Sequence, residues 1–387
     1  MQLVAYGAQD IYLTGNPQIT FFKVVYRRHT NFSMELIEQT WNGTSTSNGK
    51  CTATVSRNGD LVGRMYIDVK GTIATDTIRN PGSEFIKSVT VEIGGQQVDK
   101  HSGKYMETYA ELTQPNSAGT TCIITATNTA IAGTNFQAMS GMGGVDGANV
   151  ATDALYVPLQ FWFCRNAGLA LPLIALQYHE VKVILDHAIA TTFATTVVHN
   201  KLWAEYIYLD TDERRRFAQV SHEYLIEQVQ EQSLAAATGN HDLNFNHPVK
   251  ELIWSAASAA EGSVAATALV KPCTALSDTL RLKLNGHDRF ADQPMTYFSR
   301  TQVWQHHTGM GLNSAGAATS ARNDSICVYS FALKPEEHQP SGTCNFSRID
   351  NAQFVVSAAF PANTHVYAVN YNVLRIMSGM GGLAYSN

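Results

Sequence analysis

An internal repeat limits the folds that are open to this chain of 387 residues. The tetrapeptide Leu-Ile-Glu-Gln occurs at 36–39 and again at 225–228, 189 positions later. In each half, an alternating apolar and polar stretch then runs into a glycine turn, at 91–95 and at 282–286. A weaker pair, 181–183 and 354–356, keeps the same order at a shorter spacing. Matching order and similar spacing indicate that one domain has been duplicated.

Each copy of the repeat has the pattern of an all-β domain. Only 15% of the residues are charged, and the chain is rich in threonine, serine, asparagine and glycine, which favour strands and turns over helical bundles. In the first copy, strands are predicted at 34–41, 61–69, 85–93, 155–163, 178–185 and 202–209, and a helix at 104–113. About eight such strands per copy indicate a β-sandwich or barrel. A jelly roll fits this number, although spacing alone does not distinguish it from an immunoglobulin-like topology.

A highly charged stretch at 205–217 separates the two copies. Seven of its first twelve residues are charged: Glu205, Asp210, Asp212, Glu213, Arg214, Arg215 and Arg216. We interpret 210–217 as the joint between a first domain at 34–209 and a second at 218–387. The acidic residues from Asp210 to Glu213 are expected to pair with Arg214–Arg216, or with arginines of a neighbouring subunit, and so to set the angle between the domains. A solvated turn explains the same stretch equally well.

Three further segments are candidates for contacts outside the chain. Residues 1–33 form either an arm that packs on a neighbour or an ordinary edge strand. Phe161, Trp162 and Phe163 stand in a row, and consecutive strand residues face both ways, so they contact either a neighbour or the domain's own core. The long polar segment at 116–153 is expected to be an outward-facing surface loop.

Several functional classes lack their sequence signals. There is no phosphate-binding Gly-x-x-x-x-Gly-Lys motif, no nucleophile elbow and no metal-ligand spacing, so catalytic, cofactor-binding and metal-binding residues are not expected. The net charge is −5 and the arginine run at 214–216 follows acidic residues, which argues against direct packaging of nucleic acid. Six dispersed cysteines and the lack of a signal peptide predict synthesis in a cytoplasm. Asn42 and Asn323 begin glycosylation sequons in predicted turns.

Long phrases of the sequence carry a family resemblance. They lie at 3–32, 56–61, 156–182, 208–228, 284–290, 329–351 and 371–382. With these phrases the chain resembles the major capsid proteins of large icosahedral double-stranded DNA viruses, a group that includes the chlorella viruses and the iridoviruses.

The resemblance implies an all-β fold of two tandem eight-stranded antiparallel jelly rolls, with long surface loops and few short helices. It implies a homotrimer whose six jelly rolls form a pseudo-hexagonal capsomer in the outer capsid of the virion. The implied partners are neighbouring capsomers, minor capsid proteins and a nearby membrane on the inner face, and the host on the outer face. Two alternatives remain: a minor or vertex capsid protein, and a carbohydrate-binding β-sandwich that would need exposed aromatics such as Trp41, Trp254 or Trp304.

Overall fold

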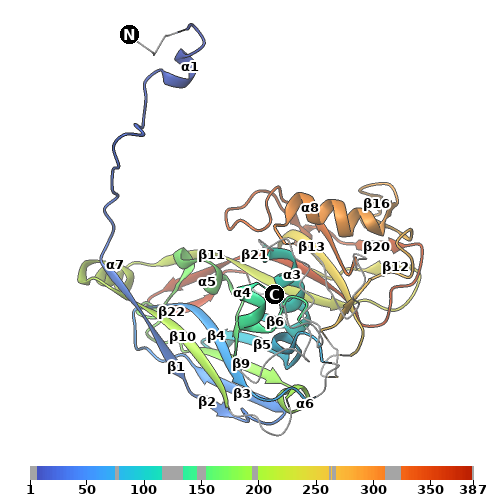
Figure 1. Cartoon of the computed structure of the whole chain (residues 1–387), viewed down its shortest axis with the longest axis horizontal. Helices are drawn as coiled ribbons and strands as arrows, with labels where there is room; N and C mark the ends of the chain where they lie inside the picture. The colour runs from blue at the N-terminus through green and yellow to red at the C-terminus, as the bar shows by residue number, and fades with distance from the viewer. Residues whose placement is uncertain are drawn as a thin grey trace.

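The chain forms four antiparallel sheets, and the sheets pack in two pairs (Figure 1). The computed structural model describes residues 7–74, 78–115, 134–145, 154–193, 199–260, 263, 267–309 and 324–385. Two pairs of facing sheets, one after the other along the chain, are the architecture that the internal repeat predicts.

The first pair of sheets is built from residues 32–209. One sheet has the order β1 (Phe32–Gln39), β10 (His199–Leu209), β4 (Leu61–Lys70), β7 (Leu155–Pro158), with β8 (Leu171–Pro172) also paired to β4. The other has the order β2 (Trp41–Gly43), β3 (Gly49–Thr54), β9 (Val181–His187), β5 (Ile86–Ile93), β6 (Gln96–Ser102). Every second residue of β9 is buried, because successive strand side chains point to opposite faces. The inward residues of both sheets form one hydrophobic core.

The second pair of sheets is built from residues 222–383. One sheet has the order β11 (His222–Ser233), β21 (Thr364–Met377), β13 (Pro248–Ala257), β14 (Leu269–Val270); β18 (Ile326–Ser330) and β19 (Cys344–Asn345) also pair with β13, and β22 (Met380–Leu383) with β21. The other has the order β12 (Gly239–Asp242), β20 (Ala352–Val356), β15 (Thr279–Leu284), β16 (His287–Asp288), with β17 (Gln293–Pro294) also paired to β15. This half has its own core around Trp254, Phe298 and Phe354.

The internal repeat corresponds to equivalent strands. The two Leu-Ile-Glu-Gln copies lie in β1 and β11, which pair with β10 and β21, the long strands that close each half. The glycine turns follow β5 and β15, and both residues of each turn have positive φ: Gly94 and Gly95, and Asn285 and Gly286. Positive φ at both central positions is the backbone of a tight hairpin turn. The weaker pair lies in β9 and β20, which are the neighbours of β5 and β15.

Helices are short and lie between the strands. They are α1 (Ile11–Thr14), α2 (Pro81–Glu84), α3 (Gly103–Thr113), α4 (Asn135–Ser140), α5 (Trp162–Arg165), α6 (Ile189–Thr192), α7 (Thr211–Gln219) and α8 (Val303–His306). Short 3₁₀ helices lie at Ala167–Leu169 and Phe346–Arg348, and a π-helix at Tyr297–Gln302 leads into α8. The helix predicted at 104–113 is confirmed as α3. The strand predicted at 155–163 is too long: β7 ends at Pro158, which has no N–H for the ladder, and α5 follows.

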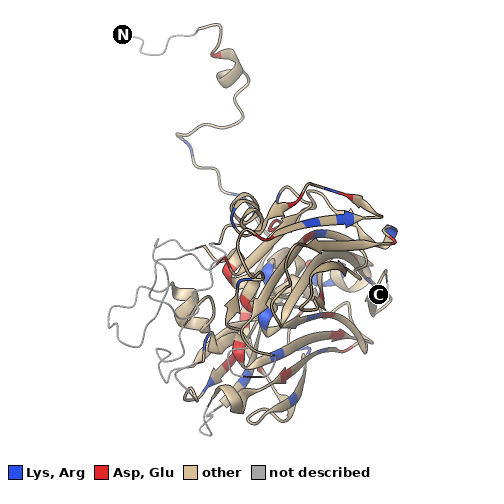
Figure 2. Ribbon diagram, turned by 90° about the vertical axis from the view of Figure 1, so that its right-hand side faces the viewer, with Lys and Arg blue, Asp and Glu red and all other residues tan. Residues whose placement is uncertain are grey.

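The N-terminal segment stands apart from both cores. From Gly7 to Asn31 it runs away from the body of the protein, as the two perpendicular views show (Figures 1 and 2). No strand forms at 19–26, although these residues have high strand propensity. Of the segment predicted as an outer loop, 134–145 contains α4 and packs through Met142 and Val145, whereas 116–133 and 146–153 lie outside the described residues.

The two halves share long strands. Ile226 of β11 and Leu374 and Ile376 of β21 belong to the core of the first half, whereas Val366 and Ala368 of β21 belong to the core of the second. A sheet that contributes to both cores resists bending between them, because bending would break its ladder hydrogen bonds.

Candidate assembly surfaces and the junction between the jelly rolls

The charged stretch predicted as a joint is a helix, α7. The Asp210 carboxylate accepts a hydrogen bond from the Thr211 amide at 2.8 Å and caps the helix. Asp212 and Glu213 lie in its first turn and Arg216 in its last. At these positions their charges interact favourably with the helix dipole. An N-cap aspartate followed by acids and then arginines is a helix signal that could have been identified in the sequence.

One arginine of α7 anchors it to the first half. The Arg214 guanidinium donates to both carboxylate oxygens of Asp60, each at 2.9 Å, in a two-pronged contact. Asp60 is 7% exposed and also accepts from the Leu209 amide at 2.8 Å. Among the residues that the structure describes, no ion pair joins the acidic residues of α7 to Arg214, Arg215 or Arg216. The expected pairing within the stretch is therefore replaced, for Arg214, by a partner 154 positions earlier.

An apolar contact supports the same anchor. Phe217 packs on a small cluster formed by Leu61, Ala170 and Ile207, on the outer face of the sheet that contains β4 and β10. Asp212, Arg215 and Arg216 are exposed. The helix thus has one face fixed to the first half and another open to solvent.

The aromatic run lies inside the protein. Phe161, Trp162 and Phe163 are 0%, 2% and 1% exposed and belong to the core of the first half. Phe161 stacks on the ring of His101, with centroids 4.7 Å apart. The helical turn of α5 lets all three side chains point inward, which a strand would not. Their burial favours the core-packing interpretation over contact with a neighbouring subunit.

A buried ionic chain begins at the end of α5. Arg165 pairs with Glu227 of β11 at 2.9 Å, and Lys250 of β13 pairs with the other oxygen of Glu227 at 2.8 Å. Lys250 and Glu227 are 2% and 5% exposed. Burial alone would raise the pKa of Glu227, but the two adjacent cations outweigh it and lower the pKa. This network of ion pairs connects a helix of the first half to the main sheet of the second.

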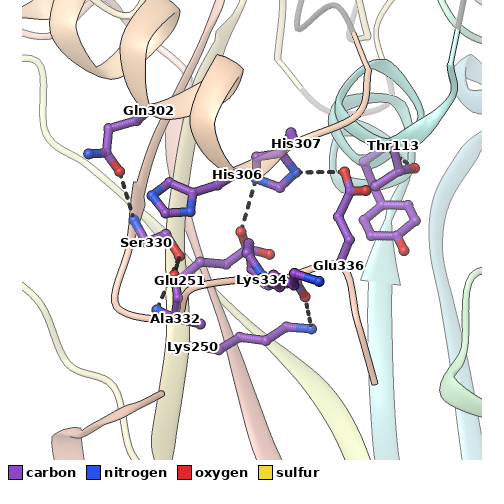
Figure 3. Close-up of polar contacts among 12 residues, drawn as sticks. Thr113, Lys250, Glu251, Gln302, His306, His307, Ser330, Ala332, Lys334 and Glu336 are labelled. Atoms are coloured by element: carbon purple, nitrogen blue, oxygen red, sulfur yellow. Dashed lines mark hydrogen bonds and ion pairs between the residues drawn. The ribbon is translucent and has the colours of Figure 1, made fainter. Parts of the chain in front are cut away.

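A histidine between two carboxylates forms a second buried group (Figure 3). His307, just after α8, places Nε2 3.0 Å from Glu251 of β13 and Nδ1 3.1 Å from Glu336. Its side chain is 2% exposed. Burial alone would lower the pKa of His307, but the two carboxylates overcome this effect and raise the pKa to about 9. The imidazole is therefore charged at neutral pH; it donates a hydrogen bond to Glu336 and forms an ion pair with Glu251.

The His307 group also holds the two halves together. Glu336 accepts from the Thr308 amide at 2.9 Å. The Thr308 hydroxyl lies 3.1 Å from the carbonyl of Thr113, and the Gly309 amide donates to the carbonyl of Leu112 at 2.7 Å. Thr113 and Leu112 end α3 of the first half. A protonated His307 thus stabilises the segment after α8 that contacts the end of α3. This group could not be predicted from the sequence, because its residues are far apart in the chain.

A broad groove crosses the outer face of the sheet formed by β1, β10, β4 and β7. Its volume is about 1120 Å³. Apolar and aromatic side chains line much of it, among them Leu36, Tyr66, Phe136, Met139 and Tyr156. Its charged lining consists of Arg64, Arg165, Glu205, Glu227 and Glu336.

The remaining candidate residues are less informative. Asn42 is exposed in the edge strand β2, opposite Thr52 of β3, so its side chain is accessible. Asn323 lies outside the described residues. Trp254 is 0% exposed and Trp304 is 80% exposed, so the tryptophans do not form a shared aromatic platform of the kind a sugar-binding module needs.

Comparison with known proteins identifies the family. Residues 20–210 match the family described as "Major capsid protein N-terminus", and residues 213–382 match "Large eukaryotic DNA virus major capsid protein". The major capsid protein of Pyramimonas orientalis virus is 50% identical over 412 residues, covering 100% of this chain and 99% of that protein. The chain belongs to this family of major capsid proteins. The major capsid protein of Paramecium bursaria Chlorella virus 1 is 40% identical over 460 residues, with the same coverage.

Solved structures of the capsid protein family agree with the fold. A chain in the quasi-atomic model of the PBCV-1 virus capsid matches with a TM-score of 0.75 and 34% identity, covering 95% of this chain and 100% of that one. The double jelly roll expected from the sequence is therefore confirmed, and the immunoglobulin-like alternative is wrong. Within the described part of the chain, no helix is long and apolar enough to cross a membrane, and no group of three or more His, Cys, Asp or Glu residues could hold a metal.

Proposed function

We propose that this capsid protein builds the outer shell of a large DNA virus as a homotrimer, with a structural and not a catalytic role. The end-to-end match to major capsid proteins carries the proposal. Three copies of a chain with two similar jelly rolls present six similar sides while needing only threefold symmetry. Such capsomers tile a surface as hexagons and contact neighbouring capsomers edge to edge.

The junction between the jelly rolls is the part of the chain that makes this geometry reproducible. The ionic network Arg165–Glu227–Lys250 and the His307 group span both halves, and Glu227, Lys250, Glu251 and His307 have buried side chains. Buried ion pairs contribute more to a unique arrangement than to net stability. We assign the boundaries 1–33 for the arm, 34–209 and 218–387 for the jelly rolls and 210–217 for the joint, and we assign to the exposed residues of α7 contacts with a neighbouring subunit.

The remaining partners follow from the proposed shell. Minor capsid proteins and a membrane lie on the inner face, the outer loops contact the host, and nucleic acid is not touched directly. The protein is made in the host cytoplasm, and Asn42 is accessible to modification.

Copy number in purified virions tests the proposal against a minor or vertex protein. Quantitative mass spectrometry should find this chain as the most abundant protein of the particle. A copy number equal to a small multiple of the twelve vertices of an icosahedron would contradict the shell role and support the vertex alternative.

A further inference from the structure

The N-terminal arm exposes far more apolar surface than a stable monomer does. Between Ile19 and Tyr26, the large apolar side chains of Ile19, Phe21, Phe22, Val24, Val25 and Tyr26 are 71–97% exposed. Exposed apolar patches of this kind mark interaction sites. The arm is therefore expected to be covered in the assembled protein.

The charge of the arm differs from that of the rest of the chain. From Ile11 to Met34 there is no aspartate or glutamate, whereas Lys23, Arg27 and Arg28 are positive. The whole chain has a net charge of −5. An apolar segment followed by cations calls for an apolar site with carboxylates at its margin.

The groove on the first jelly roll has these properties. Leu36, Met139 and Tyr156 line it and are 42%, 41% and 40% exposed, so part of its apolar lining is uncovered in a single copy. Glu205 supplies a carboxylate to the lining, whereas Arg165 and Glu336 are already paired with Glu227 and His307. At about 1120 Å³, the groove exceeds the usual 300–1,000 Å³ of a small-molecule pocket and can take several aromatic side chains.

We propose that the arm segment 19–26 of one copy occupies this groove on a second copy of the chain. The inference rests on the proposed self-assembly and names the contact that holds it together. The arm leaves the body at Phe32, beside the end of β10, and points away from its own jelly rolls (Figure 1). At about 3.3 Å per residue, a fully extended arm places Tyr26 about 20 Å and Ile19 about 40 Å from Phe32, where β1 begins, enough to meet a neighbour. Every copy carries both an arm and a groove, so the exchange can close into a ring.

Engineered disulfides test the contact directly. The double variant Phe22→Cys with Tyr156→Cys places one thiol on the arm and one in the groove. Mild oxidation of the purified protein should give covalent dimers and trimers on a non-reducing gel. The matched control joins Phe22→Cys to Tyr178→Cys, because Tyr178 is 75% exposed and lies outside the groove lining, and it should remain mostly monomeric on the gel. Each variant with only one of these added cysteines should also remain mostly monomeric on the gel.

A second measurement separates this inference from the proposed function. The variant Phe21→Ser with Phe22→Ser alters side chains that pack on nothing in the single copy, so its fold should be intact. We expect its subunits to associate at least tenfold more weakly in light scattering. The inference alone would be overturned if the serine variant formed oligomers as the wild type does and the Phe22→Cys, Tyr156→Cys variant gave no covalent dimers or trimers. A disulfide within one chain of the cysteine variant would also overturn it. A wild-type protein that stays monomeric at all concentrations would overturn the self-assembly itself.

Discussion

The histidine held between two glutamates predicts a specific loss of stability at alkaline pH. The two carboxylates raise the pKa of His307 from 6.5 to about 9, against the opposing effect of burial. A raised pKa in the folded state means that protonation stabilises the fold. The contribution is fully present below about pH 6.5 and is lost as the pH rises through about 9. The difference between these pKa values corresponds to about 3 kcal/mol of unfolding free energy.

Replacing His307 by glutamine should remove both the stabilisation and its pH dependence. Glutamine carries no charge, so Glu251, which is 3% exposed, would lose its cationic partner. Removing one partner of a buried pair costs about 3 to 5 kcal/mol. The control is His306→Gln: this neighbour is only partly buried and contacts a backbone carbonyl at 3.3 Å, so the change should cost less than about 1 kcal/mol.

The assay is urea unfolding of the wild type and both variants from pH 6 to pH 10. The difference in unfolding free energy between wild type and His307→Gln reports the contribution of the histidine alone, because other groups that titrate in this range contribute equally to both proteins. The difference in unfolding free energy between wild type and His307→Gln should shrink by about 3 kcal/mol from pH 6 to pH 10. The corresponding difference for His306→Gln should not change with pH. A wild-type minus His307→Gln difference that is constant with pH would refute the assignment of a charged imidazole at the junction.

Two further substitutions have clear expectations. Arg214→Gln should cost about 1 to 3 kcal/mol in unfolding free energy, because it leaves the buried Asp60 carboxylate without its cation, whereas the exposed Arg215→Gln should cost less than about 0.5 kcal/mol; equal effects would contradict the anchoring of α7. Trp162→Ala should lower the unfolding free energy by about 3 to 5 kcal/mol through the cavity it leaves, whereas Trp304→Ala should lower it by less than about 0.5 kcal/mol. Chemical denaturation measures both, and the reverse order would contradict the burial of Trp162.

The repeat and the strand patterns made the architecture predictable. The Leu-Ile-Glu-Gln pair and the two glycine turns occupy equivalent strands and hairpins, because side-chain alternation and positive-φ turns are local properties that the sequence encodes directly. The error at 155–163 has a local cause as well, since Pro158 marks the end of β7.

The junction could not be predicted in the same way. Asp60 and Arg214 are 154 positions apart, and His307, Glu251 and Glu336 come from three separate segments. Such pairs depend on how the sheets stack, and a single sequence holds no signal of which distant charges meet. The phrase at 56–61 contributes to the family resemblance, but nothing in it indicates which partner the carboxylate of Asp60 has.

The mass of the purified protein in solution tests the central claim most directly. Light scattering after size exclusion should give a species near three times the chain mass of 42.3 kDa, as expected for a trimer with six jelly rolls. A well-folded protein that keeps the mass of a single chain, even at concentrations well above those at which a shell protein self-assembles, would contradict the account.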